Sequence, residues 1–388
     1  MLRKLSDFIT IKHGFAFKGE DISGIDNGVM LVTPGNFAIG GGFQKHKCKF
    51  FVGKYPEEYV LNPRDLIVTM TDLSKEGDTL GYGALVPGDG YIYLHNQRIG
   101  LVEIHKEGLN KEYLYWFMRS RNYQRAVVSS CSGSVIKHTS PARITNIEID
   151  LPELSTQTRI ASILSALEFK IELNTAINNN LEQQAQALLT NFLDSDSIPY
   201  KLLTDIAVIK YGKGLATKNL LDSGYPVFGG NGIIGYYTDY LYAEPQILVS
   251  CRGAASGNIL ESLPYSYVTS NSLVVELADR RYYEIIKRFL MLHPLHSYAT
   301  GSAQPQITID NLKNVTVPYP EMDKLNTITP VFESFAQKTL QIHIENERLA
   351  AIRDALLPKL MSGEIDVSKV DISDPGCLDK SLFNKETE

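Results

Sequence analysis

The chain has 388 residues, 44% of them hydrophobic, which is enough for two or three domains with real cores. Its net charge of −6 argues against a general nucleic-acid binder, because Lys and Arg usually supply DNA affinity by neutralising phosphates. No apolar run reaches the roughly 20 residues of a membrane-spanning helix, and the sequence from Met1 does not resemble a signal peptide, so we expect a cytoplasmic protein.

The charge is unevenly distributed along the chain. Residues 1–150 contain 18 Lys and Arg against 16 Asp and Glu, and residues 199–320 contain 10 against 9. The acidic excess therefore lies in the remaining segments. Two nearly neutral segments can still carry a basic face for DNA. The four cysteines form no CxxC pair, so neither a disulfide framework nor a zinc site is expected.

Residues 1–152 are predicted to form the first globular domain. Short apolar runs at residues 28–35 and 65–70, interrupted by Gly, Pro and Asp, have the composition of strands. Residues 111–128 have a helical pattern. The mixture predicts an α+β domain with a twisted β-sheet.

Residues 153–193 have the period of a long coiled-coil helix. The apolar positions recur every three or four residues and form a heptad seam that includes two asparagines: Leu164, Leu167, Ile171, Asn174, Asn178, Leu181, Ala185, Leu188 and Phe192. An asparagine inside such a seam costs stability but restricts the register. For Asn178 the sequence leaves open whether it lies in the seam or on a rotated, solvated face.

A linker at residues 194–199 leads to the second predicted domain, residues 200–320. Strand-like runs at residues 247–250 and 272–275 and a helical patch at residues 280–292 again indicate an α+β domain. The chain contains 21 tyrosines, which suits loops that pack against a partner.

Residues 321–363 repeat the heptad pattern, displaced by 168 positions. The second seam is Phe332, Phe335, Thr339, Ile342, Asn346, Leu349, Arg353, Leu356 and Leu360. Each helix should measure roughly 50–60 Å, and amphipathic helices this long need a partner, so we expect them to pair antiparallel. Pro330 is expected near the helix start, where proline is tolerated, and residues 364–388 are expected to be a loosely ordered, polar and acidic tail.

The two globular segments are copies of one plan. Leu5–Gly14 reappears as Leu203–Gly212, an offset of 198, and Gly133-Ser134 reappears as Gly301-Ser302, an offset of 168. The first segment is therefore longer by 30 residues. The starts and ends of the two globular segments repeat, whereas their central parts differ. This pattern predicts a common scaffold, related by a pseudo-two-fold repeat, that presents two different surfaces. An old duplication whose two halves drifted neutrally would give the same pattern.

No catalytic motif is complete. Asn62-Pro63-Arg64-Asp65 lacks the second proline and the aromatic residue of a DNA methyltransferase motif. Gly229–Gly235 lacks a Walker lysine and reads as a turn. Glu168-Phe169-Lys170 has the form of a nuclease triplet but lies within the heptad helix, where charged helix surface is expected. His293 and His296 have no further ligand nearby, so no metal site and no catalytic residue are predicted.

Three stretches resemble the specificity (S) subunits of type I restriction-modification systems. Residues 157–174, from Gln157 to Asn174, are similar to the central conserved helix of that family. Residues 356–365 resemble the distal end of its second helix, and Gly133 and Gly301 resemble the closing segments of its recognition domains. The second copy departs from the family pattern at residues 322–327, which replace the usual Gln-Arg-Ile helix start.

The resemblance implies a non-catalytic DNA-specificity subunit with two target recognition domains. Each domain would read one half of a split double-stranded DNA site, and the helices would set the gap and dock two methyltransferase subunits. Two restriction subunits with motor activity would complete the complex, and S-adenosylmethionine, ATP and Mg would bind to these partners, not to this chain. The alternative is a coiled-coil assembly protein that reads no DNA sequence.

The candidate DNA contacts are basic and amide side chains in predicted loops. Arginine suits guanine and Asn or Gln suits adenine, whereas lysine more often contacts the backbone. Lys45, Lys47 and Lys49 are expected to alternate along one strand face. The remaining candidates are Lys75, Gln97, Arg98, Lys137 and His138 in the first domain, and Lys213, Lys218, Asn231, Arg252, Asn271, Gln304 and Gln306 in the second. For each of them, a solvated surface position is the alternative.

Overall fold

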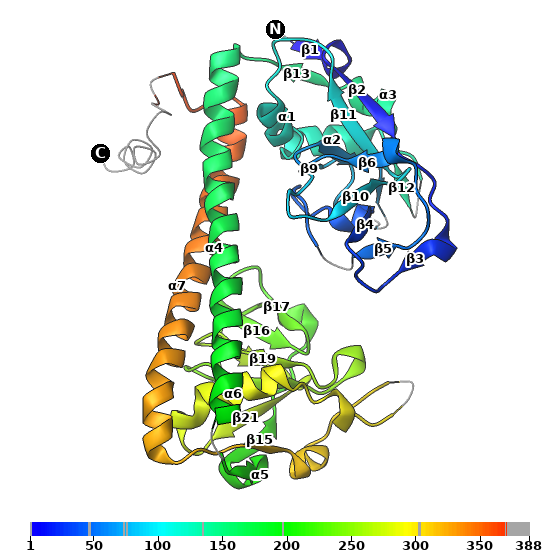
Figure 1. The fold of residues 1–388 in the computed structure, drawn as a ribbon. Helices are drawn as coiled ribbons and strands as arrows, with labels where there is room; N and C mark the ends of the chain where they lie inside the picture. Colours follow the sequence, from blue (N-terminus) through cyan, green and yellow to red (C-terminus); the bar gives the residue numbers. More distant parts are fainter. Residues whose placement is uncertain are drawn as a thin grey trace, which may run out of the picture. The chain divides into compact units, whose positions relative to one another are not determined.

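The computed structural model describes residues 2–45, 48–72, 74, 77–133, 136–195, 198–301, 304–368 and 370. The chain divides into two compact units, which we describe separately: unit 1 comprises Met1–Glu172 with Asn346–Glu388, and unit 2 comprises Leu173–Glu345. Each unit combines one α+β domain with part of each of two long helices (Figure 1). The predicted fold class is confirmed. Within the described ranges, no helix is both long and apolar enough to cross a lipid bilayer.

The two long helices pair antiparallel, as predicted. Helix α4 spans Leu154–Ser195, 42 residues, and helix α7 spans Met322–Met361, 40 residues. In unit 1, Glu168 of α4 pairs with Arg353 of α7. In unit 2, Asn174 Nδ2 donates to Glu345 Oε2 over 2.8 Å. Also within unit 2, Asn178 of α4 pairs with Thr339 of α7. The partner therefore moves back along α7 as the position advances along α4, which is the signature of antiparallel pairing.

The predicted seam faces protein in both units. None of its positions on α4 or α7 is exposed, and Leu164, Ala185, Phe332, Ile342 and Leu360 are fully buried. Asn178 is half-buried and its Nδ2 donates to the Thr339 carbonyl oxygen over 3.4 Å. Asn178 therefore lies in the seam and not on a solvated face.

Two details of the second helix and its tail differ from expectation. Pro330 lies well inside α7, which begins at Met322. A proline deprives the carbonyl four residues earlier of its donor, but Asn326 and Pro330 are exposed, so water can hydrate that carbonyl. The tail is not loose where it begins, because Val367 is only 2% exposed and packs in the core of unit 1. Residues 371–388 lie outside the described residues.

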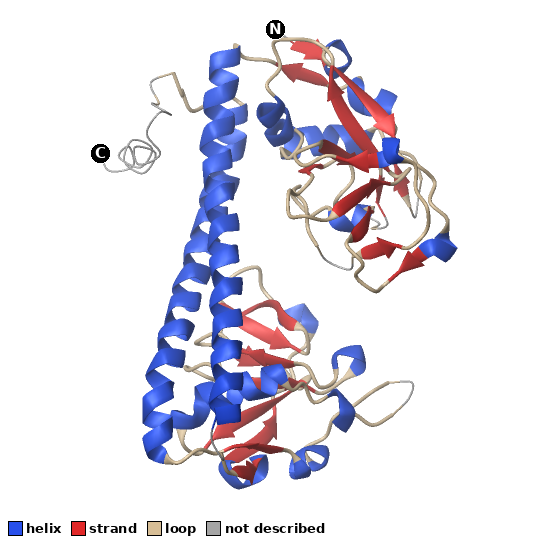
Figure 2. Ribbon diagram, viewed as in Figure 1, coloured by secondary structure: helices blue, strands red, loops and turns tan. Residues whose placement is uncertain are grey.

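Unit 1 contains two main sheets (Figure 2). A four-stranded sheet has the order β2-β11-β7-β9, and a five-stranded sheet has the order β3-β5-β4-β10-β6. The small pairs β1-β13 and β12-β8 complete the unit. The strands are β1 Leu2–Lys4, β2 Ile9–His13, β3 Ile22–Ser23, β4 Val29–Val32, β5 Lys49–Phe51, β6 Val60–Leu61, β7 Leu66–Thr69, β8 Thr71–Asp72, β9 Gly83–Leu85, β10 Ile92–His95, β11 Ile99–Ile104, β12 Lys137–His138 and β13 Glu148–Asp150.

The helices of unit 1 are α1 Lys111–Phe117, α2 Arg121–Ser129 and α3 Pro141–Thr145. The helical pattern predicted at residues 111–128 is therefore confirmed, but it is divided into two helices, α1 and α2. It is broken because Ser120 caps a new helix, its Oγ accepting from the Tyr123 amide over 3.3 Å.

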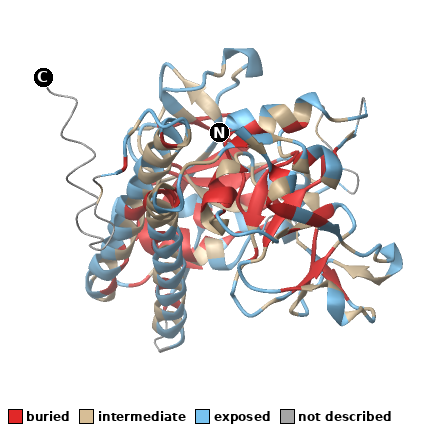
Figure 3. Ribbon diagram, turned by 90° about the horizontal axis from the view of Figure 1, so that it is seen from above, coloured by how far each residue is buried: buried red, intermediate tan, exposed pale blue. Residues whose placement is uncertain are grey.

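Unit 2 has a four-stranded sheet, β15-β21-β18-β19, a three-stranded sheet, β17-β16-β20, and the pair β14-β22. The strands are β14 Tyr200–Leu202, β15 Ala207–Tyr211, β16 Tyr225–Gly229, β17 Gly232–Tyr237, β18 Ile247–Ser250, β19 Ile259–Glu261, β20 Tyr267–Val268, β21 Ser272–Leu277 and β22 Thr316–Pro318, and the short helices are α5 Leu203–Ile206 and α6 Tyr283–Leu292. The strands β7 and β18, at matching places in the two units, are buried along their whole lengths. Figure 3 shows buried segments in the sheets and exposed segments along much of the long helices.

The sheet topology repeats between the units. The four-stranded sheets match strand for strand and are antiparallel throughout, and the parallel pair β4-β10 corresponds to the parallel pair β16-β20. Strands β3 and β6 of unit 1 have no counterpart, and they lie between Gly14 and Ile99. Most of the extra residues of the first segment therefore lie between β2 and β11, the part of the chain that also contributes these two strands.

A repeated glycine allows the close approach on which both sheets depend. A Cβ on Gly14 would lie 2.3 Å from the His95 carbonyl oxygen, and a Cβ on Gly212 would lie 2.3 Å from the Thr269 carbonyl oxygen. Both oxygens belong to backbone that other hydrogen bonds hold in place, so neither can move cheaply. The repeated Lys-X-Gly sequence at residues 12–14 and 210–212 is thus explained by backbone contact.

We expect Gly212→Ala to destabilise the protein by about 3 kcal/mol, because the new methyl group overlaps the Thr269 carbonyl. Gly214→Ala is the matched control, since nothing lies within 4 Å of its Cβ position, and it should change the unfolding free energy by less than about 1 kcal/mol. Urea unfolding of both variants measures the difference. Equal stability of the two variants would contradict this account.

Candidate nucleic-acid interface

Three strands of the four-stranded sheet in unit 2 meet at one end. β15 and β18 end there and β21 begins there, because β21 is antiparallel to both neighbours. The Cys251 amide donates to the Asn271 carbonyl over 3.0 Å, and the Ile307 amide donates to the Cys251 carbonyl over 3.0 Å. Arg252 and Gln306 face each other across an isolated bridge. The exposed side chains of Arg252, Asn271 and Gln306 therefore come from neighbouring strand ends.

Three further predicted residues join them. The Lys213 amide donates to the Val268 carbonyl over 2.9 Å, and Gln304 precedes Pro305, whose carbonyl accepts from the Gly253 amide over 2.9 Å. Asn231 follows Gly230, whose carbonyl accepts from Ser250 Oγ. We call this group the second tip: Lys213, Asn231, Arg252, Asn271, Gln304 and Gln306, all exposed. Lys218 is also exposed, on the 3-10 helix Thr217–Asn219, but nothing ties it to this group.

Unit 1 builds the same arrangement with the same hydrogen bonds. The Met70 amide donates to the Arg98 carbonyl over 3.0 Å, and the Thr139 amide donates to the Met70 carbonyl over 3.0 Å. The Phe15 amide donates to the His95 carbonyl over 2.8 Å. His138 exchanges two backbone hydrogen bonds with Ser132, as Gln306 does with Thr300. We call this group the first tip: Phe15, Thr71, Gln97, Arg98, Lys137 and His138. Phe15, Gln97, Arg98 and His138 are exposed and Lys137 is half-buried, whereas Thr71 is buried, with its Oγ1 3.2 Å from His138 Nδ1, and supports the exposed His138 ring.

Equivalent positions in the two tips carry different chemistry. Arg98 corresponds to Asn271, Thr71 to Arg252, His138 to Gln306 and Phe15 to Lys213, as their shared hydrogen bonds place them. Phe15 and Thr71 were missed by sequence reasoning. The repeated glycines Gly14 and Gly212 were the available signal for Phe15, because each directly precedes a tip residue.

The three lysines predicted on one strand face are not arranged so. β5 begins only at Lys49, so Lys45 lies in the preceding loop. The Lys45 ammonium is 2.5 Å from the Asp89 carboxylate and 4.2 Å from the centre of the Tyr91 ring. Lys47 and Lys75 lie outside the described residues. Lys45 and Lys49 are exposed, Lys45 in the loop before β5 and Lys49 at the start of β5, and neither belongs to the first tip.

A buried carboxylate supports the loop beside the first tip. Asp72 is 4% exposed and accepts from the Thr79 hydroxyl over 2.8 Å and from the Ser74 amide over 2.7 Å. Burial raises the pKa of Asp72, but these hydrogen bonds lower it further, so the net pKa is below the usual value. Asp72 therefore remains ionised and ties Ser74 and Thr79 to the end of β8.

A buried ion network fastens the domain of unit 1 to both helices. Arg119 Nη1 lies 3.1 Å from Glu168 of α4, and Glu168 also pairs with Arg353 of α7. Arg119 Nε donates to the Gly40 carbonyl over 3.0 Å, so the loop of the five-stranded sheet is included. Glu168 was expected to be charged helix surface; this is wrong, because its side chain is only 22% exposed and both of its partners come from other elements.

Unit 2 fastens its domain with a different set of charges. Arg288 of α6 donates from Nη1 to Glu182 of α4 over 3.1 Å, and its Nε lies 3.3 Å from Glu284 in an ion pair without hydrogen-bond geometry. Lys287 contacts Glu284 over 2.7 Å and Glu261 over 2.9 Å. Burial raises the pKa of Glu284, and the pairs with Lys287 and Arg288 offset only part of that effect.

The departure of the second helix start from the first has a structural solution. In unit 1, Gln157 is fully buried and its Nε2 donates to the Pro152 carbonyl over 2.8 Å. Leu325 takes the place of Gln157 and is fully buried in apolar surroundings. The repeat-equivalent Pro320 carbonyl instead accepts from the Tyr282 hydroxyl over 3.1 Å. The proline carbonyl before each long helix therefore accepts a hydrogen bond, but the donor differs between the two units.

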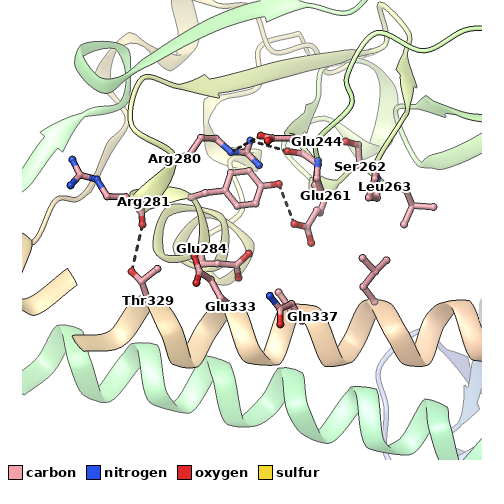
Figure 4. A pocket seen from close by; sticks show the side chains of 15 residues that line it. Glu244, Glu261, Ser262, Leu263, Arg280, Arg281, Glu284, Thr329, Glu333 and Gln337 are labelled. Atoms are coloured by element: carbon pink, nitrogen blue, oxygen red, sulfur yellow. Dashed lines mark hydrogen bonds and ion pairs between the residues drawn. The ribbon is translucent and has the colours of Figure 1, made fainter. Parts of the chain in front are cut away.

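Unit 2 also contains a hollow of about 610 Å³ between its domain and α7 (Figure 4). Loop residues beside β18 and β19, residues around the start of α6, and one face of α7 line it. Its carboxylates are Glu244, Glu261, Glu284 and Glu333. Across the described part of the chain, no three His, Cys, Asp or Glu side chains are placed to hold a metal ion. The rings of His293 and His296 contact the Phe289 and Ser256 carbonyls instead.

Comparison with known proteins points to one family. The family model described as the type I restriction modification DNA specificity domain matches residues 1–183 and again residues 199–353. The MjaIX specificity subunit of Methanocaldococcus jannaschii, a type I restriction enzyme subunit, is 25% identical over 69% of this chain and 72% of its own length. The EcoprrI specificity subunit of Escherichia coli is 27% identical over 37% of each chain.

A solved structure has the same fold. The crystal structure of a type I restriction-modification S subunit from M. genitalium superposes with a TM-score of 0.58 at 18% identity, covering 93% of this chain and 95% of that one.

We expect Glu168→Gln to lower the unfolding free energy of unit 1 by about 3 kcal/mol at pH 7, because the buried Arg119 loses its counter-charge and the half-buried Arg353 keeps only Asp354. Burial raises the pKa of Glu168, but Arg119 and Arg353 lower it further, so the folded pKa lies below the usual 4.5. The stabilisation is therefore present above pH 4.5 and is lost as the pH falls through the folded pKa. Denaturant unfolding of wild type and variant across this range should show two curves that converge in acid; a difference independent of pH would contradict the assignment.

Proposed function

Because the chain belongs to the type I restriction modification DNA specificity family, and is therefore a non-catalytic subunit that supplies DNA sequence specificity, we propose that each globular domain reads one half of a split duplex site through its tip. The observation that carries this proposal is the repeated tip: one set of backbone hydrogen bonds presents different side chains at equivalent positions. A common frame with different donors and acceptors is suited to two different base sequences.

The exposed tip residues have the chemistry of base readout. Arg98 and Arg252 can each present two N–H groups to guanine O6 and N7, and Asn271 and Gln306 can make the paired contacts that adenine offers. Lys213 is exposed and Lys137 is half-buried, and both suit the phosphate backbone, which fixes register without reading sequence. The near-neutral charge of residues 1–150 and 199–320 permits these local basic positions despite the overall charge of −6.

We assign residues 1–152 and 200–320 as the two target recognition domains, 153–193 and 321–363 as the central and distal coiled-coil helices, 194–199 as the linker and 364–388 as the tail. An α-helix of 42 residues measures roughly 60 Å, about the length of 18 base pairs. The helices would set the gap between half-sites and dock two methyltransferase subunits. Two restriction subunits would add ATP-driven motor and nuclease activity, and S-adenosylmethionine, ATP and Mg would bind to these partners.

The net charge of −6 supports a second candidate, an assembly protein without sequence readout. Such a protein would leave the DNA affinity of the assembled complex unchanged between specific and scrambled duplexes. A DNA-reading subunit should instead give specific binding that weakens steeply with salt.

Single substitutions at equivalent tip positions test the proposal. In the complex with the methyltransferase subunit, Arg98→Ala should relax one half-site and Asn271→Ala the other, each costing about 1–3 kcal/mol of discrimination. Mapping of methylated adenines on a library of split sites measures both. Lys218→Ala is the control and should leave the pattern unchanged. If both tip variants altered the same half-site, or neither altered any, the tips would not be the reading surfaces.

A further inference from the structure

The turn that carries Asn231 is held against the four-stranded sheet of unit 2 by two buried serines. β16 ends at Gly229, and a two-residue turn, Gly230 and Asn231, leads into β17. Ser272 Oγ donates to the Gly229 carbonyl over 3.1 Å, and Ser250 Oγ donates to the Gly230 carbonyl. The two hydroxyls therefore hold consecutive carbonyls, one at the strand end and one in the turn. We call Ser250 and Ser272 the serine pair.

The serine pair is a cross-strand pair. Ser250 ends β18, Ser272 begins β21, and the two residues lie opposite each other in the antiparallel ladder. Residues opposite each other in such a ladder project their side chains to the same face of the sheet. Both serines are 0% exposed, so neither hydroxyl is open to solvent. Their hydrogen bonds to the turn therefore join the four-stranded sheet to the three-stranded sheet.

The frame that the two domains share does not require hydroxyls at these positions. The equivalent cross-strand pair in unit 1 is Thr69 and Ile99, both fully buried. Isoleucine has no hydroxyl, and Thr69 Oγ1 donates to the Thr71 carbonyl over 2.9 Å. In unit 1, residues 33–48 join β4 to β5 in place of the short turn between β16 and β17. The serine pair therefore accompanies the short turn of the second domain.

The turn lies beside the strand end that carries Asn271. A Cβ on Gly230 would lie 3.4 Å from the Asn271 carbonyl oxygen and 3.8 Å from the Asn271 Cβ. Asn231 and Asn271 are both exposed. By fixing the turn, the serine pair therefore fixes one exposed amide relative to another within the second tip.

The turn needs such fixing because its own backbone is permissive. Gly230 and Gly232 flank Asn231, and glycine leaves the chain many accessible conformations. An asparagine that reads adenine must meet N6 and N7 together, which requires placement to within roughly 0.5 Å. Hydrogen bonds to two consecutive carbonyls restrict the turn before DNA binds, so less ordering has to be offset by the contact itself.

We propose that Asn231 reads a base of the second half-site and that the serine pair sets the position from which it does so. Both serines are buried and act through the turn, so they are positioning residues and not DNA contacts. This inference rests on the proposed function, which assigns DNA reading to the second tip. It adds two buried residues that determine specificity to the exposed residues of that tip.

The test uses the full-length chain in complex with the methyltransferase subunit and maps methylated adenines on a library of split sites. Asn231→Ala should lower discrimination at one position of the second half-site by about tenfold. Ser250→Ala combined with Ser272→Ala should lower discrimination at the same position by about the same factor and leave the first half-site unchanged. Addition of Asn231→Ala to this serine variant should cause no further loss, because the serines act through Asn231.

Ser266→Ala is the matched control. Ser266 is also fully buried in unit 2, and its hydroxyl donates to the Leu263 carbonyl over 2.6 Å. It directly precedes β20, however, whereas Thr269, the bridge partner of Lys213, follows the other end of that strand. Ser266→Ala therefore removes a buried hydroxyl of the same kind away from the second tip, and it should leave the reading of both half-sites unchanged.

Each other outcome would overturn the inference in a recognisable way. Normal reading of both half-sites by the serine variant would remove the positioning role. Relaxation of both half-sites, or a further loss on addition of Asn231→Ala, would indicate a general structural role instead. An effect of Asn271→Ala without an effect of Asn231→Ala would exclude Asn231 from the reading surface, while the proposed function would stand. If Arg98→Ala, Asn231→Ala and Asn271→Ala all left the methylation pattern unchanged, the proposed function would fail together with this inference.

Discussion

Neither globular domain closes its hydrophobic core without residues from both long helices. The core of unit 1 includes Ile160 and Leu164 from α4, together with Leu360 from α7, which lies about two hundred residues further along the chain. The core of unit 2 includes Leu189 from α4 and Phe332 from α7. The helices are thus not spacers attached to finished domains. Unit 1 is built from two separated stretches, residues 1–172 and 346–388, and unit 2 from the single stretch 173–345. In both units the core needs parts of α4 and α7, which explains why the repeat keeps its register through the helices while the surfaces of the domains differ.

Ion pairs reinforce the attachment of each domain to the long helices. Hydrophobic contacts alone would allow a domain to slide along a helix. Arg119 reaches Glu168 in unit 1, and Arg288 reaches Glu182 in unit 2, so in both units an almost fully buried arginine of the domain pairs with a glutamate of α4. Buried ion pairs add little net stability, because desolvation offsets most of the attraction, but a misplaced domain would leave these arginines unpaired. They therefore select one seating of the domain on the helices. A recognition tip needs such a seating if it is to meet a fixed point on a duplex.

The sequence predicted what depends on periodicity and repetition. The heptads placed both helices and their seam, and the repeated Gly14 and Gly212 marked where the two sheets meet a neighbouring backbone. It did not predict features that arise only when distant strands pair. Thr71 belongs to the first tip because β8 pairs with β12, more than sixty residues away, and no local pattern records that pairing. From the sequence, Glu168 was expected on the helix surface, because its arginine partners come from other elements and leave no local signal.

The most direct test of the shared cores is hydrogen–deuterium exchange of Leu360→Ala. Leu360 is 1% exposed, so its truncation should cost about 2–5 kcal/mol. If α7 completes the core of unit 1, exchange should accelerate in residues 1–152, far from the substitution in sequence, and stay unchanged in residues 200–320. Acceleration confined to the last turns of α7, with the first domain unaffected, would contradict the account and make the helix end a separate element.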